Sequence, residues 1–187
     1  MKKQTLIFLF VFALSFSVSA QQSVDKKIEN IRKIYTEISQ NISATEKTEE
    51  SGRTSEIAVN ELVVNKLNKS WAAVGNYKVV YRFYYQNQDE EPYPTQLVKV
   101  TRSTESAARK YFEEFVYDEN DKLIFYFEKS EDGEAPLERR IYFQNEKPIR
   151  LVEDKNSNDK ISVKNEAVSK VLKENNKIKQ IFINSID

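Results

Sequence analysis

The sequence predicts an α+β fold, in which an antiparallel β-meander of about six or seven strands carries an N-terminal and a C-terminal amphipathic helix packed on one face. Two observations predict it. A hairpin-like segment occurs twice between residues 109 and 154, and the second copy begins 25 residues after the first. On both sides of this strand-rich region, apolar residues recur at the three- and four-residue gaps of a helix.

The duplicated segment runs from 115 to 128 and again from 140 to 153, aligned without a gap. Each copy predicts a strand, a tight turn and a second strand, so 109–154 is predicted to be a four-stranded meander. The identical positions are Tyr117 and Tyr142, Asn120 and Asn145, Lys122 and Lys147, Ile124 and Ile149, and Glu128 and Glu153.

Both copies are expected to turn through a three-residue loop, 119–121 in the first and 144–146 in the second. A type I turn closed by a residue in the left-handed region fits that length. Glycine suits the closing position best because it has no Cβ. Here that position holds Asp121 and Glu146.

The first helix is predicted over residues 24–42, with Ser23 as its cap. Glu29 and Lys33 should form an i,i+4 pair on its wet side. A coiled-coil seam of under three heptads is too short, which favours docking on the chain's own sheet. The polar run 43–55 predicts a mobile linker. The apolar stripe consists of Val24, Ile28, Ile31, Tyr35, Ile38 and Ile42.

Between this linker and the meander, strands are predicted at 57–67, 77–86 and 96–101. The segments between them are predicted loops: 68–76, which carries Trp71, the acidic turn 87–94, which carries Tyr93, and the connection 103–107.

The last helix is predicted over 164–184. The residues that recur at helical spacing are Val168, Val171, Leu172, Asn175, Ile178, Ile181 and Phe182. The pair Asn175–Asn176 leaves open an alternative, in which the helix breaks and 178–184 forms a short final strand.

Side chains alternate between the two faces of a strand, so odd and even positions of the meander are expected to separate into a core face and a solvated face. Two charges, Glu113 and Arg139, interrupt the odd face and are expected at its wet margin. The predicted core consists of Tyr111, Phe115, Tyr117, Leu123, Phe125, Phe127, Leu137, Ile141, Phe143, Ile149 and Leu151.

The first 20 residues predict a secretory signal peptide rather than part of the fold. A positive start at Lys2 and Lys3 precedes the apolar run 6–14, which is too short to span a membrane, and small residues lead up to cleavage after Ala20. Residues 21–187 are then expected to form a single periplasmic or secreted domain.

Composition excludes several functions. The chain has no cysteine and no histidine, which excludes a Ser-His-Asp triad, a Cys-His pair and an ordinary zinc site. Without Lys2 and Lys3, 27 basic residues face 29 acidic ones, so no basic patch predicts nucleic-acid binding. No metal site and no cofactor are predicted, because the polar run 154–159 lacks the glycine and the closing glutamate of a calcium loop.

The preferred interpretation is a non-catalytic binding or interaction domain of the cell envelope, whose partner is a protein or a glycan. Tyrosine and arginine dominate binding hot spots, and the even face and the two aromatic loops supply them. The predicted contact residues are Trp71, Arg82, Tyr84, Tyr93, Tyr126, Arg140, Tyr142 and Arg150. The alternatives are a carbohydrate-active hydrolase that pairs Glu113 or Glu114 with Glu128, and a purely structural envelope component.

The turn sequence Tyr-Asp-x-Asn-x-Lys-Leu, at 117–123, resembles the hairpin repeats of MORN-like and YD-type exported bacterial β-proteins, although it lacks their turn glycine. The whole layout also resembles small exported proteins of unknown function in Gram-negative bacteria. The resemblance implies an envelope location and brings no catalytic residue with it.

Overall fold

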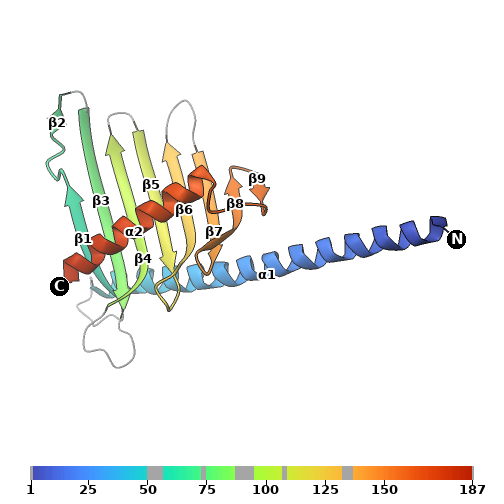
Figure 1. Cartoon of the computed structure of the whole chain (residues 1–187). Coiled ribbons are helices and arrows are strands. Elements are labelled where there is room, and N and C mark those ends of the chain that lie inside the picture. The colour runs from blue at the N-terminus through green and yellow to red at the C-terminus, as the bar shows by residue number, and fades with distance from the viewer. Residues whose placement is uncertain are drawn as a thin grey trace. The chain divides into compact units, whose positions relative to one another are not determined.

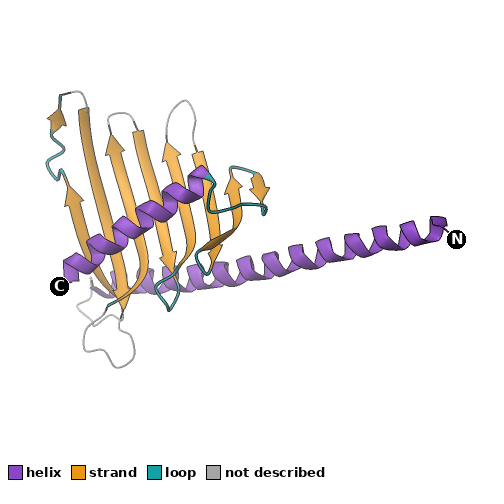
Figure 2. Cartoon of the chain, in the orientation of Figure 1, coloured by secondary structure: helices purple, strands orange, loops and turns teal. Residues whose placement is uncertain are grey.

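The protein is an α+β structure with a nine-stranded, mostly antiparallel sheet and two helices, one at each end of the chain (Figure 1; Figure 2). The computed structural model describes residues 2–49, 57–72, 75–86, 95–106, 109–131 and 137–186, with side chains described for 23–47 of the first range. The chain divides into two compact units, residues 1–34 and 35–187. The sheet and the second helix belong to the second unit.

The sheet has more strands than predicted because two short segments of the predicted loops also pair. The strands lie in the order β1-β3-β4-β5-β6-β7-β8-β9, and β2 also pairs with β3. Their bounds are β1 Ile57–Val64, β2 Ser70–Trp71, β3 Gly75–Gln86, β4 Gln96–Ser106, β5 Arg109–Tyr117, β6 Leu123–Glu131, β7 Leu137–Gln144, β8 Lys147–Glu153 and β9 Asn156–Asn158.

Three boundaries of the strands before the meander differ from the prediction, and the smallest difference is the start of β3 at Gly75 instead of residue 77. β4 continues through residues 103–106, predicted as a connection, because these residues pair with both β3 and β5. β1 ends at Val64 instead of continuing to Leu67, because Asn65 adopts a φ of 53° and starts a turn.

The first helix, α1, spans Lys2–Glu49 and is longer than predicted at both ends. It includes the segment predicted as a signal peptide and the first part of the predicted linker 43–55; residues 50–56 lie outside the described part. The linker prediction is wrong for 43–49, because good helix formers are present and Ile42 and Thr45 are buried. The predicted pair of Glu29 and Lys33 is confirmed at 3.3 Å.

The second helix, α2, spans Glu166–Ile186 and confirms the predicted C-terminal helix. The Asn165 side chain caps it by accepting a hydrogen bond from the Val168 amide at 3.3 Å. The alternative of a final strand is wrong, because Asn175 is buried inside the helix and accepts a hydrogen bond from the Tyr117 hydroxyl at 2.8 Å.

The helix α2 crosses one face of the sheet, which we call the α2 face (Figure 1). Its buried residues Val168, Val171, Ile178 and Phe182 complete the main core. The strand residues of this core are Phe83, Leu97, Val100, Phe115, Tyr117, Leu123, Tyr126, Ile141, Phe143 and Leu151.

Residues 35–46 of α1 contact the other face of the sheet, which we call the opposite face. Ile42 packs with Tyr84 and Val98, and the Tyr35 ring lies 5.3 Å from that of Phe125. The prediction that both helices pack on one face is therefore wrong for this part of α1. Both faces of the sheet present apolar rows, so each has its own cover.

Odd positions face the core in β5 and β7 as predicted, but the assignment is inverted in most of β6. Tyr117 pairs with Leu123, whereas Val116 pairs with Phe125, so Ile124 is an extra residue in the ladder. Such a bulge reverses the faces of the residues that follow. Phe125 and Phe127 consequently lie on the opposite face, and Tyr126 lies in the core.

The first hairpin turns as predicted. The Asp118 amide bonds the Lys122 carbonyl at 3.0 Å, and Asp121 closes the loop with a φ of 55°. The second hairpin has a two-residue turn, Asn145–Glu146, with φ of 49° and 61°. Two left-handed residues define a type I′ turn, so the three-residue loop predicted there is wrong.

Candidate functional site

The three tyrosines of the predicted contact surface are buried rather than displayed. Tyr84, Tyr126 and Tyr142 are between 2% and 4% exposed. Tyr84 packs with Ile42, and Tyr126 lies in the core beneath α2. A surface that needs these rings to meet a partner is therefore absent from the folded domain.

The three arginines of that surface lie apart and are paired. Arg82 pairs with Glu61 at 2.9 Å, and Arg150 holds both carboxylate oxygens of Asp159. Arg140 pairs with Glu138 at 2.5 Å. Three strands separate Arg82 on β3 from Arg140 on β7, so the arginines do not converge on one site.

Of the two aromatic residues predicted in loops, the structure describes Trp71 alone. Trp71 is 56% exposed on the short strand β2, so it remains a candidate contact residue. Tyr93 lies outside the described residues.

The glutamate pair proposed for a hydrolase belongs to a row of charges that runs across the α2 face. Glu113 and Glu128 are direct cross-strand partners, as Glu128 and Arg139 are. The row, from β4 to β8, is Arg102, Glu113, Glu128, Arg139 and Glu153. Glu113 and Arg139 were predicted at a wet margin, but Glu113 is buried and Arg139 is half-buried.

Arginines form ion pairs with the carboxylates of this row. Arg102 donates to both oxygens of Glu113, one at 2.7 Å, and reaches Glu174 of α2 at 3.1 Å. Arg139 bridges Glu128 at 2.9 Å and Glu153 at 2.8 Å. Buried charges are tolerated when they are paired and hydrogen-bonded in this way. The pairing leaves Glu113 without a free oxygen for a substrate.

Two side chains of the same network, Tyr126 and Arg102, have raised pKa values. Burial, together with the charges of Glu113 and Glu128, raises the pKa of Tyr126, whose hydroxyl donates to Glu113 at 2.9 Å. Burial opposes the charge on Arg102, but hydrogen bonding and ion pairing with Glu113 raise the pKa of its guanidinium above the ordinary value. These groups are held in one protonation state, as a structural ion-pair network requires.

The second proposed pair, Glu114 with Glu128, is divided by the sheet, because adjacent residues of β5 point to opposite faces and Glu128 shares the face of Glu113. Glu114 pairs with the buried Lys99 at 2.5 Å and accepts a hydrogen bond from Tyr35 at 2.9 Å. Burial and the charge of Glu114 raise the pKa of Tyr35 to about 12. This cluster fastens residue 35 of α1 to the sheet.

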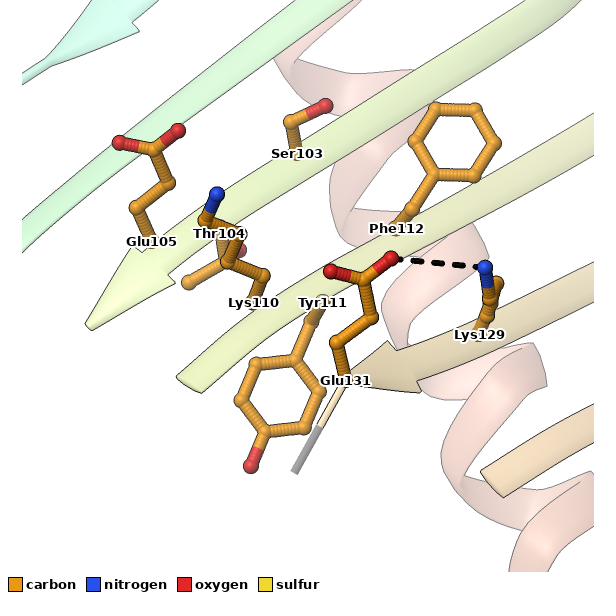
Figure 3. Close-up of a pocket in the computed structure, with 8 residues that line it drawn as sticks. All are labelled: Ser103, Thr104, Glu105, Lys110, Tyr111, Phe112, Lys129 and Glu131. Atoms are coloured by element: carbon orange, nitrogen blue, oxygen red, sulfur yellow. Dashed lines mark hydrogen bonds and ion pairs between the residues drawn. The ribbon is translucent and has the colours of Figure 1, made fainter. Parts of the chain in front are cut away.

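A hollow of about 190 Å³ lies where strands β4 and β6 end and β5 begins (Figure 3). Phe112 is 36% exposed there, and Lys129 pairs with Glu131 at 3.4 Å. The lining residues are Ser103, Thr104, Glu105, Lys110, Tyr111, Phe112, Lys129 and Glu131. Its charges balance, with two lysines against two glutamates.

An aromatic strip extends from this hollow across the opposite face of the sheet. The Phe112 and Phe127 rings meet edge to face with centroids 6.4 Å apart, and the guanidinium of Arg140 lies over Phe127 at 5.4 Å. Sequence reasoning missed this strip because the bulge at Ile124 was not foreseen, so Phe127 was placed in the core. The available signal was Phe112, an aromatic between the even polar positions of Lys110 and Glu114.

Comparisons of the chain with protein-family models, with characterised proteins and with solved structures found no match. Among the residues whose side chains the structure describes, no helix is long and apolar enough to cross a membrane, and no three acidic side chains are grouped as metal ligands.

Proposed function

We propose that this chain is a non-catalytic, exported binding domain that recognises a glycan of the cell envelope at the hollow formed by β4, β5 and β6. The observation that carries the proposal is the exposed phenyl ring of Phe112 among the balanced charges of Lys110, Lys129, Glu105 and Glu131. The signal-like start of the sequence supports export to the envelope.

The chemistry of the lining favours a neutral polyhydroxyl ligand. A phenyl face suits the apolar face of a sugar ring, and ammonium and carboxylate groups respectively donate and accept hydrogen bonds to hydroxyls. An anionic ligand would meet the two glutamates, and a cationic one would meet the two lysines.

The size of the hollow favours one unit of a longer ligand. About 190 Å³ is less than the roughly 300–1,000 Å³ of a site that encloses a drug-sized molecule. A glycan chain would place one sugar in the hollow and continue along the strip of Phe127 and Arg140.

The hydrolase alternative receives less support. A glycosidase needs two carboxyl groups that reach the substrate from an open cleft. Glu113 and Glu128 are cross-strand neighbours, but both are buried and each forms an ion pair with an arginine. The structural-component alternative predicts no ligand at all, which the following experiment tests.

The experiment titrates the purified protein with neutral oligosaccharides released from bacterial envelopes and follows amide chemical shifts. We expect saturable shifts in residues 103–105, 110–112 and 129–131. Phe112→Ala should weaken binding at least tenfold, whereas Val163→Ala, at a more exposed apolar residue outside the hollow, should leave it unchanged. Shifts that do not saturate, or that are unaffected by Phe112→Ala, would refute the site. Turnover of the oligosaccharide would instead favour a hydrolase.

A further inference from the structure

The two edges of the sheet differ in a way that points to an interface. One edge is β9, three polar residues long, Asn-Ser-Asn. The other is β1, eight residues long and mainly apolar, and no described strand pairs with its outer side. A long apolar edge strand is a template for pairing with another chain, and proteins normally shorten, charge or cover it.

Exposed apolar side chains gather along the β1 edge. Leu62 and Val64 lie on β1 itself, and Leu67 and Trp71 follow in the adjoining turn and in β2. Ile183 and Ile186 lie at the end of α2, where Phe182 packs on Tyr85, the β3 residue that pairs with Ala58 of β1. These are six of the eight large apolar residues exposed in the described part of the chain.

We propose that two copies of this chain associate through β1, so that their sheets join edge to edge across a two-fold axis. In an antiparallel pair, residues that oppose one another lie on the same face of the sheet. The two-fold axis must therefore lie where one residue opposes the same residue of the other copy. With the axis at Leu62, this side chain faces Leu62 of the second copy and lies diagonally next to its Val64. The two Leu62 side chains are thereby buried against each other, and each Val64 lies opposite Asn60 of the other copy.

Charge excludes one competing register and makes the second copy an acceptable partner. Glu61 is the only charged residue of β1 and pairs with Arg82 of β3. A register centred on Glu61 would oppose two carboxylates, which is unfavourable, whereas the register centred on Leu62 places Glu61 opposite Val63. A two-fold interface uses the same patch on both copies, so the interface requires no feature beyond the edge already described.

The first measurement is the mass in solution of the protein purified from cells that produce the full chain. Light scattering should give twice the mass of one chain. Leu62→Lys places two cations face to face at the axis and removes two buried leucines, so it should raise the dissociation constant roughly 100-fold or more. Val163→Lys is the matched control, an exposed apolar residue away from this edge, and it should remain dimeric.

The second measurement tests the register by cross-linking. Because the chain has no native cysteine, an introduced cysteine is the only thiol that can react. Leu62→Cys should join the two copies through a short thiol-reactive cross-linker, whereas Val163→Cys should not. The urea midpoint of each variant confirms that the monomer fold is retained. A monomeric mass at tens of micromolar protein, or a dimer that survives Leu62→Lys, would overturn the proposal. A dimer that Leu62→Cys fails to cross-link would overturn the register.

Discussion

The two copies of the hairpin repeat have similar sequences but different environments. Phe115 of the first copy is fully buried, whereas its equivalent Arg140 pairs with Glu138 at the surface. Since β5 and β7 both place odd positions on the α2 face, an offset of 25 residues moves equivalent positions to different faces. An odd repeat length thus places Phe115 on the α2 face in the first copy and its equivalent, Arg140, on the opposite face in the second.

The second strands of the two copies keep the same orientation. Each contains an extra residue at the same repeat position, Ile124 in β6 and Ile149 in β8. Tyr126 and its equivalent Leu151 therefore both reach the core. The turns differ by one residue, three in the first copy and two in the second, which compensates for the change of face between β5 and β7.

The largest difference in stability between equivalent substitutions is expected at the first strand of each copy. Phe115→Ala should lower the free energy of unfolding by about 3–5 kcal/mol, because it empties a fully enclosed site. Arg140→Ala should cost less than about 1 kcal/mol, because it removes an ion pair at the surface. Urea unfolding of both variants measures the difference, and similar costs would contradict the assignment of faces.

The second prediction concerns the link between the first copy and α2. Tyr117→Phe should destabilise the protein by about 1–3 kcal/mol, because it leaves the buried oxygen of Asn175 without its hydrogen bond. Adding Asn175→Leu should recover much of that loss, since both partners are then apolar. Equal stabilities of the single and double variants in urea would argue against this bond.

The third prediction is a loss of stability in alkali to which two tyrosines of the first copy contribute. Burial raises the pKa of Tyr117 and Tyr126 above the ordinary 10.0. A raised pKa means that the folded state holds the proton more tightly, so this stabilisation is complete below pH 10 and is lost as the pH rises above it. Each tyrosine should lower the folding constant up to tenfold per pH unit.

Urea unfolding between pH 9 and pH 11 measures this decline. Tyr117→Phe and Tyr126→Phe should each make the decline shallower, and a variant with an unchanged slope would show that its tyrosine does not contribute.

The smallest effect is expected at the turns. Glu146→Gly should stabilise the protein by about 0.5–1 kcal/mol, because Glu146 adopts a φ of 61° that glycine accepts without strain. Asp121→Gly should gain less, since aspartate adopts the left-handed region more readily than glutamate. The melting temperatures of the two variants test this, and a lowered value for Glu146→Gly would contradict the turn geometry.

Much of the fold could be predicted because it follows from local periodicity. The stripe from Val168 to Phe182 predicted α2, and the duplicated segment predicted four strands of the sheet. The candidate site could not be predicted in the same way. A single extra residue at Ile124 moved Phe127 and Lys129 to the opposite face, and whether a ladder contains a bulge depends on the partner strand.

By itself, the sequence determined the C-terminal helix, the seven long strands, the hairpin repeat and the left-handed positions Asp121 and Glu146, because these depend on side-chain spacing and on the preferences of single residues. Only the tertiary structure decided which face each residue occupies, that Tyr84, Tyr126 and Tyr142 are enclosed, and that Glu113 and Glu128 are paired with arginines. Those outcomes depend on strand register and on which helix covers which face, and both are set by contacts between residues far apart in the chain.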